Sequence, residues 1–256
     1  MNVWHDSNGV GPDLVLLHGW GMNAAVWQPL MNALCERYRV TRIELPGHGA
    51  SPHIASPGKR DLDAWAEACL AVAPDQACWV GWSLGGLVAQ SAALIAPQRI
   101  RKLGLVASTP SFVKRPNWNP ALELAVFEQF AAALLADPTA TLKRFLGLQV
   151  KGAEHARDVL RQLNDALAER PAATAEGLAQ GLRLLREGDL RESLSDLNLP
   201  VHWLLGQRDT LIPVALEESL QRLRPHDILQ TIPGAGHAPW LSHPADSLAW
   251  VENCCG

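Results

Sequence analysis

The apolar residues of the first 110 positions fall into two alternating patterns. Short apolar runs predict strands at 14–17, 38–45, 77–81 and 102–107. Apolar residues at helical spacing predict helices near 24–36, 59–72 and 84–96. Strands that alternate with helices are typical of a mostly parallel sheet with helices on both faces. Ahead of them, residues 2–11 can supply an antiparallel leading hairpin, with Asn8 and Gly9 as its turn.

The pattern changes after Pro110. Up to about Leu190 the chain has a helical pattern rich in alanine, leucine, arginine and glutamate, without a convincing strand. Strand-like runs return at 201–206 and 227–233, with helices expected near 213–223 and 245–253. Two late strands are too few for a sheet of their own. We therefore predict one α/β core, formed by residues 1–109 and 191–256, and a helical lid inserted at 110–190.

Composition excludes several kinds of partner. The 256 residues carry a formal net charge of −4 and a pI near 6.1, whereas nucleic acids and anionic membranes attract basic proteins. No apolar run approaches the ~20 residues that span a bilayer, and the N-terminus lacks the layout of a signal peptide. We expect a cytoplasmic protein and a monomer. The five cysteines contain no C-x-x-C, so we expect free thiols and neither a disulfide framework nor a zinc site.

A serine lies among glycines where one apolar run gives way to a helical pattern. In GWSLGG (81–86), Gly81, Ser83 and Gly85 match G-x-S-x-G, the tight strand-to-helix turn that presents a nucleophilic serine to a cleft. The alternative is a helix cap, which by itself does not require the surrounding glycines. We predict that Ser83 is a nucleophile.

A serine nucleophile needs a base, and the base needs an acid that orients it. His237 follows the last predicted strand in a glycine-containing loop. Asp209 follows the strand at 201–206, whereas the loop after the strand at 102–107 offers no carboxylate. We predict that His237 is the base and Asp209 the acid. The alternatives are a loop histidine that bonds only to backbone and an aspartate that merely forms a turn.

Two backbone N–H groups are candidates for an oxyanion hole. The N–H of Leu84 follows the nucleophile at the start of a helix, whose dipole favours negative charge. The N–H of Trp20 lies in HGWG (18–21), after an early strand. We expect His18 to hold this loop by hydrogen bonds and His48 to pack or bond near the site without reacting.

The chain order Ser83, Asp209, His237 is that of α/β-hydrolases. Five motifs resemble that superfamily over essentially the whole chain: HGWG (18–21), ELPGHGAS (44–51), GWSLGG (81–86), GQRDTLIP (206–213) and GAGHAPWLSHP (234–244). Four stretches look more closely like the family of pimeloyl-acyl-carrier-protein methyl ester carboxylesterases of biotin synthesis: LVLLHGWGMNAAVW, WVGWSLGGLVA, RFLGLQVKGAEHAR and HAPWLSHPA. In that family a tryptophan follows the first His-Gly and another precedes the serine, as Trp20 and Trp82 do here.

The resemblance implies the α/β-hydrolase fold, hydrolysis of the methyl ester on pimeloyl-acyl-carrier protein, and activity on short-chain esters. It also implies a set of substrate contacts: Trp20, Ser83, Leu84, Phe145, Leu146, Gly147, Leu148, Gln149 and His237. Among these, the apolar residues between 145 and 148 can line an acyl tunnel, with Gln149 as a polar end group. The alternative is that they are simply the buried stripe of a lid helix.

Acyl-carrier proteins are acidic, so a surface that binds one should be basic. Arg144, Arg157 and Arg161 match the lid arginines that bind the carrier in the family, and the last two are spaced i,i+4, on one helix face. Residues 140–142 read Ala-Thr-Leu where the family has a further arginine. A solvated helix face is the alternative.

Together these features predict a serine carboxylesterase that needs no metal and no organic cofactor and acts on a small or carrier-bound acyl ester. Two rivals share the fold: a C–C bond hydrolase or lyase, and a non-catalytic ligand receptor. Haloalkane dehalogenation is disfavoured, because it needs a carboxylate where Ser83 stands.

Overall fold

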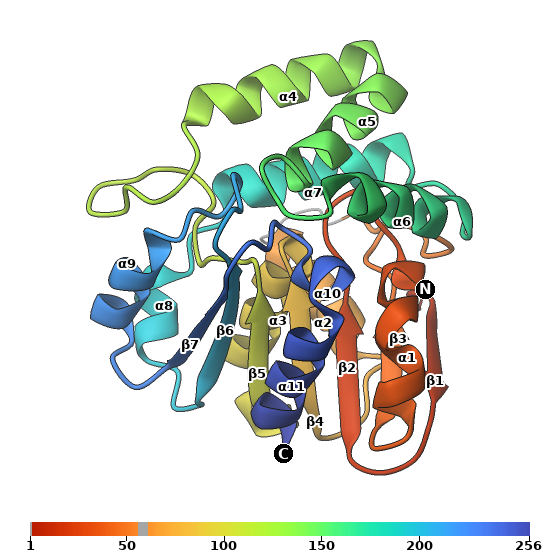
Figure 1. Ribbon diagram of the computed structural model, residues 1–256, viewed down its shortest axis with the longest axis vertical. Helices are drawn as coiled ribbons and strands as arrows, with labels where there is room; N and C mark the ends of the chain where they lie inside the picture. The colour runs from red at the N-terminus through yellow and green to blue at the C-terminus, as the bar shows by residue number, and fades with distance from the viewer. Residues whose placement is uncertain (1, 56–60) are drawn as a thin grey trace.

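A seven-stranded sheet forms the centre of the computed structural model, which describes residues 2–55 and 61–256 (Figure 1). In chain order the strands are β1 (His5–Asn8), β2 (Asp13–Leu17), β3 (Arg39–Ile43), β4 (Ala77–Trp82), β5 (Ile100–Val106), β6 (Val201–Gly206) and β7 (Ile228–Ile232). Their order across the sheet is β1-β3-β2-β4-β5-β6-β7, and every neighbouring pair is parallel except β1 with β3. The predicted mostly parallel sheet is confirmed.

The expected leading hairpin is wrong. β1 pairs antiparallel with β3, His5 opposite Ile43, and not with β2, the next strand in the chain. Both edges of β2 are already occupied by β3 and β4. The connection from β1 to β2 instead passes the start of β3, where Gly9 (φ +88°) comes so close to the Tyr38 carbonyl that a Cβ would lie 2.4 Å from its oxygen.

Helices cover both faces of the sheet because side chains alternate between the two faces along each strand. On one face Leu14, Leu16 and Val80 pack with residues of α1 (Gln28–Cys35), α10 (Pro239–Ser242) and α11 (Pro244–Cys255). On the other, Val15 and Trp79 pack with residues of α2 (Asp61–Leu70), α3 (Leu84–Ile95), α8 (Arg191–Ser195) and α9 (Leu216–Leu223). Short 3-10 turns occur at Ala24–Trp27, where a longer helix was predicted, and at Pro97–Arg99. The predicted helix near 59–72 is observed from Asp61; its first two positions lie outside the described residues.

Four helices between β5 and β6 lie over the edge of the sheet at which its parallel strands end (Figure 1). They are α4 (Leu124–Ala136), α5 (Pro138–Gln149), α6 (Ala156–Ala168) and α7 (Ala175–Glu187). Asp137 caps α5 by accepting from Ala140 N (2.9 Å), and Thr174 caps α7 by accepting from Gly177 N (3.0 Å).

An ion pair joins these helices to the core. Arg170, between α6 and α7, donates to both carboxylate oxygens of Glu44 at 2.9 and 3.1 Å. The Glu44 side chain is fully buried and also accepts from the backbone N–H groups of Ala24 and Ala50. The buried carboxylate therefore connects the end of β3, the start of the first 3-10 turn and the loop between α6 and α7.

The cysteines differ from expectation. Cys78 at the start of β4 is bonded to Cys255 at the end of α11, so the prediction of five free thiols is wrong for these two. Their separation of 177 residues carries no sequence signal. Cys35, Cys69 and Cys254 are free, and burial raises the pKa of both Cys69 and Cys254 to about 12. Among the described helices, none has the length and apolar character to cross a bilayer.

Candidate active site

Ser83 occupies a strained turn between β4 and α3. Its backbone has φ 54° and ψ −117°, outside the usual left-handed region and costing roughly 1–3 kcal/mol for a non-glycine residue. The turn is this tight because Gly81 and Gly85 lie against each other: a Cβ on Gly81 would lie 2.4 Å from the Gly85 oxygen. Ser83 stands at the N-cap of α3, yet its side chain makes no capping hydrogen bond to the described chain. The helix-cap interpretation is therefore wrong, and its hydroxyl remains available for chemistry.

Asp209 and His237 are joined by a short hydrogen bond. His237 Nδ1 lies 2.7 Å from Asp209 Oδ2, and both side chains are buried. The other carboxylate oxygen, Oδ1, accepts from the N–H groups of Leu211 (2.8 Å) and Ile212 (3.0 Å). Asp209 thus forms the turn after β6 and also orients the histidine. With Nδ1–H donated to a carboxylate, the lone pair of the imidazole is at Nε2.

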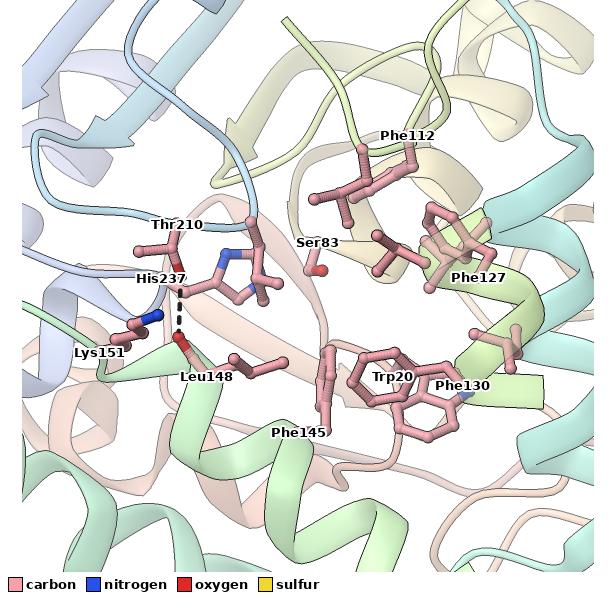
Figure 2. Close-up of a pocket in the computed structure, with 15 residues that line it drawn as sticks. Trp20, Ser83, Phe112, Phe127, Phe130, Phe145, Leu148, Lys151, Thr210 and His237 are labelled. Carbon is pink, nitrogen blue, oxygen red and sulfur yellow. Dashed lines mark hydrogen bonds between the residues drawn. The ribbon is translucent and has the colours of Figure 1, made fainter. Parts of the chain in front are cut away.

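The loop that carries His237 is held from two sides. Its backbone N–H donates to the Gln149 carbonyl at the end of α5 (3.1 Å), and its carbonyl accepts from the indole N–H of Trp82 (2.7 Å). His237 Nε2 is buried and has no hydrogen-bond partner within residues 2–55 and 61–256. Ser83 and His237 line the same cavity and lie next to each other in it (Figure 2). The free nitrogen of the imidazole and the hydroxyl of Ser83 therefore belong to one cavity, as proton transfer from a serine to a base requires.

The two candidate oxyanion donors are brought together by a close approach of backbone. A Cβ on Gly85 would lie 2.4 Å from the His18 carbonyl oxygen, so the first turn of α3 packs directly on the loop after β2. The backbone N–H groups of Leu84 and Trp20 have no backbone acceptor in the described chain. Trp20 and Ser83 line the cavity, and Leu84 directly follows Ser83 in the chain but is not among the residues that line it.

His18 and His48 hold the surrounding loops. The ring of His18 bonds to the Gly19 carbonyl through Nδ1 (2.8 Å) and accepts from Leu45 N through Nε2 (3.0 Å). Complete burial lowers the pKa of His18 to about 4 and, with the neighbouring His18, that of His48 to about 3. Both rings are therefore neutral near pH 7, and His18 must be neutral to accept from Leu45 N through Nε2. The expectation that His18 holds the loop at residues 18–21 by hydrogen bonds is confirmed.

The cavity has a volume of about 220 Å³ and mostly apolar walls. All four phenylalanines of the chain line it: Phe112, Phe127, Phe130 and Phe145. Three of these were missed by the motif-based analysis, although a chain with only four phenylalanines, all between 112 and 145, offers a compositional signal. Lys151 and Thr210 also line the cavity and are exposed, so the cavity opens to solvent beside them (Figure 2).

The predicted lid contacts divide between two faces of α5. Phe145 and Leu148 line the cavity, because residues three apart share a helix face. Leu146, Gly147 and Gln149 are not among the residues that line it, so their contact with substrate stays a prediction. Leu146 packs with the core on the α1 side of the sheet, and Gln149 is buried with neither amide atom bonded to a described residue.

The three predicted carrier-binding arginines lie on the outside of the lid. Arg144 on α5 is exposed, as are Arg157 and Arg161 one turn apart on α6. Arg161 pairs with Asp158 on its own helix (3.0 Å), with both side chains more than half exposed. Such a pair contributes little to stability and can exchange partners.

One cluster of possible metal ligands occurs among the described residues. It consists of Cys78, Cys254 and Cys255, and two of these sulfurs are bonded to each other. None of the three lines the cavity that contains Ser83.

Comparisons with known proteins give matches over nearly the whole chain. The model of a family described as "Alpha/beta hydrolase family" matches residues 14–249. A protein of Aeromonas hydrophila named pimeloyl-[acyl-carrier protein] methyl ester esterase is 44% identical over 256 residues, covering 100% of both chains. A protein of the same name from Methylococcus capsulatus is 42% identical over 243 residues, covering 95% of this chain and 94% of that one.

Two solved structures show the same fold. An esterase from Exiguobacterium antarcticum superposes with a TM-score of 0.87 at 21% identity, covering 98% of this chain and 94% of the other. A hydrolase from Pseudomonas aeruginosa PA01 gives a TM-score of 0.79 at 26% identity, covering 98% and 93%.

Proposed function

The chain belongs to the alpha/beta hydrolase family, among the pimeloyl-[acyl-carrier protein] methyl ester esterases, and from this membership we propose that it hydrolyses the methyl ester of a carrier-bound pimeloyl group in biotin synthesis. It is a carboxylic ester hydrolase, as its relatives are named. One observation carries the proposed chemistry: the Asp209–His237 hydrogen bond leaves Nε2 free in the cavity that Ser83 lines.

The proposed reaction proceeds through an acyl-enzyme. Ser83 Oγ attacks the ester carbonyl while His237 Nε2 takes its proton, and Asp209 stabilises the resulting imidazolium. The N–H groups of Leu84 and Trp20 hold the oxyanion. His237 then protonates the departing methanol, and a water molecule, activated by the same nitrogen, releases the acid and restores Ser83.

We infer that residues 110–190 act as a lid on a core made of 1–109 and 191–256. Ten of the fifteen residues that line the cavity come from this segment, among them Phe112, Phe145 and Leu182. The core supplies Trp20, Ser83 and His237, together with the loop after β6. The lid thus supplies the apolar walls that bind the acyl chain, and the core supplies the reacting groups. A cytoplasmic location and a monomeric state stay predictions.

The decisive experiment compares the wild type with Ser83→Ala on a methyl ester of pimeloyl-acyl-carrier protein and on p-nitrophenyl butyrate. We expect the wild type to turn over both and the variant to lose both activities by at least about 10³-fold. A fluorophosphonate should label only the wild type. Rescue of a biotin auxotroph that lacks its esterase, by the wild type and not by Ser83→Ala, would establish the physiological substrate.

The same assays separate the rival functions. Slow single-turnover acylation of the wild type without product release would indicate a ligand receptor. Turnover of a ring-cleavage diketone in preference to both esters would indicate a C–C bond hydrolase. Good ester turnover without rescue of the auxotroph would indicate a general esterase and contradict the proposal that the physiological substrate is carrier-bound.

We further propose that Arg144, Arg157 and Arg161 bind the acidic carrier. The proposal is supported by the exposure of these arginines on α5 and α6, two helices of the lid that covers the cavity. Changing all three to glutamate should lower kcat/KM for the carrier-bound ester about tenfold relative to p-nitrophenyl butyrate, since exposed charge pairs are each worth up to ~1 kcal/mol. Arg222→Glu on α9, equally exposed and also in an intrahelical ion pair, is the matched control. If the ratio of kcat/KM for the carrier-bound ester to that for p-nitrophenyl butyrate is unchanged in the triple variant, the arginines do not contribute to carrier binding.

A further inference from the structure

A second apolar hollow lies on the other side of the lid wall from the catalytic cavity. It has a volume of about 320 Å³ and runs between α4 and α7, lined by Leu134 and Leu135 of α4 and by Ala179 of α7, among others. Leu135 is 85% exposed, so the hollow is open to solvent as a groove. We call it the α4–α7 groove.

Two side chains belong to both hollows. Phe127 of α4 and Leu182 of α7 line the catalytic cavity and also the α4–α7 groove. They are only 5% and 7% exposed, although each has an open space on either side. A side chain that borders two hollows at once separates them. Phe127 and Leu182 are therefore the partition between the cavity and the groove.

The α7 half of this partition is fixed to the catalytic core. The indole N–H of Trp20 donates to the Leu178 carbonyl in the first turn of α7 (2.9 Å). Gly181 brings the helix so close that a Cβ there would lie 2.8 Å from the Trp20 ring. Leu182 is thus held in place through the same residue whose backbone N–H is a candidate oxyanion donor. The wall has a defined position relative to Ser83.

The partition lies on the apolar side of the serine. In Figure 2, Phe127 is found on the opposite side of Ser83 from Lys151 and Thr210, where the cavity opens to solvent. A carrier-linked chain can leave through that opening. The group of the substrate that lies on the Phe127 side meets the partition.

We propose that Phe127 and Leu182 set the longest apolar group that the enzyme accepts on this side of the scissile ester, a length limit that rests on the proposed ester hydrolysis at Ser83. A chain that ends before the partition is buried in the cavity. A longer chain must displace well-packed side chains or fold back. If the partition is trimmed, the cavity joins the α4–α7 groove, and further methylenes gain a binding surface. Each buried methylene is worth up to about a fourfold gain in kcat/KM.

The test measures kcat/KM for two series of esters. One varies the acyl chain of p-nitrophenyl esters from C2 to C12, and the other varies the alcohol of butyrate esters from methyl to decyl. In Phe127→Ala, and separately in Leu182→Ala, we expect the ratio of C10 to C4 activity to rise at least tenfold in one of the series. The series that responds identifies which part of the substrate lies against the partition.

Two controls test the partition rather than the size of the cavity. Phe112→Ala also removes a phenyl ring from the cavity wall, but Phe112 does not line the groove. The ratio of C10 to C4 activity in this variant should therefore change by less than threefold. Leu134→Ala widens only the groove and should leave the ratio unchanged. If Phe127→Ala loosens the lid, as thermal unfolding would reveal, Phe127→Leu and Leu182→Ala test the same wall with smaller changes.

The outcomes separate the length limit from the proposed function. No hydrolysis of any ester by the wild type would end the proposed function. Normal hydrolysis of short esters, with a chain-length profile that is unchanged in both partition variants, would overturn the length limit alone. An equal shift in Phe112→Ala would also overturn it, because cavity volume would then be the determinant.

Discussion

Replacement of Asp209 by asparagine tests the proposed mechanism with almost no change in shape. In the wild type one carboxylate oxygen accepts from His237 Nδ1 (2.7 Å), and the other accepts from the N–H groups of Leu211 and Ile212. An asparagine keeps only one oxygen acceptor. Either the histidine or the two backbone N–H groups must therefore lose their hydrogen-bond acceptor.

The two buried N–H groups determine which way the amide of the asparagine is oriented. If the amide oxygen faced His237, the amide NH₂ would face the two buried N–H groups, at a cost of about 1–3 kcal/mol for each unsatisfied donor. We expect the opposite orientation, in which the NH₂ donates to His237 Nδ1. That hydrogen bond forces the proton onto Nε2, so the imidazole can no longer accept a proton from Ser83. A loss of general-base catalysis of this kind corresponds to about 10³–10⁴ in kcat, or roughly 4–5.5 kcal/mol of barrier.

The assay is steady-state hydrolysis of p-nitrophenyl butyrate, with urea unfolding as the control. We expect kcat to fall by about 10³–10⁴ while the free energy of unfolding changes by less than about 1 kcal/mol, because both backbone N–H groups keep their acceptor. A folded Asp209→Asn enzyme with kcat within tenfold of the wild type would show that this aspartate does not orient the base.

Three further predictions concern the scaffold around the site. Ser83→Gly should abolish ester turnover yet raise the free energy of unfolding by about 1 kcal/mol, because glycine adopts the positive φ of this turn without strain; lower stability in urea unfolding would contradict this. The pKa of His18 is about 4 in the folded protein and 6.5 when exposed, so the unfolded state binds the proton more readily. About 3 kcal/mol of stability that is present above pH 6.5 should therefore be lost as the pH falls to 4. Urea unfolding from pH 7.5 to 4.5 measures this slope, and His18→Gln should reduce it. Arg170→Ala should cost about 2–3 kcal/mol of stability by leaving the buried Glu44 carboxylate without its cation, and recovery of most of that loss in Arg170→Lys would assign it to charge.

Much of the core could be predicted because its signals are local. Apolar runs and helical spacing place strands and helices to within a few residues, since a period of two or 3.6 is a property of neighbouring positions. The turn at Ser83 is also local: Gly81 and Gly85 are required by contacts made within the turn and with the adjoining loop. Loops that follow parallel strands meet at one edge of the sheet, which is why Asp209 and His237 could be paired across 28 positions.

The remaining features depend on contacts between distant segments. Spacing alone could not show which face of α5 meets the cavity. Phe145 and Leu148 line it, whereas Leu146 packs with the core on the α1 side of the sheet. The pairing of β1 with β3 and the bond between Cys78 and Cys255 are likewise settled only when the sheet is complete.

By itself the sequence determined the fold class, the turn that carries Ser83 and the loops that hold its partners, because these follow from residues close together in the chain. Only the tertiary structure decided the shape of the substrate cavity. Four phenylalanines converge there, and Phe127 meets Leu182 across two helices to separate the cavity from a groove. The physical reason is that one pattern of apolar residues allows a lid helix to pack at many rotations about its own axis. Only the total packing of the helices against the core selects one of these rotations.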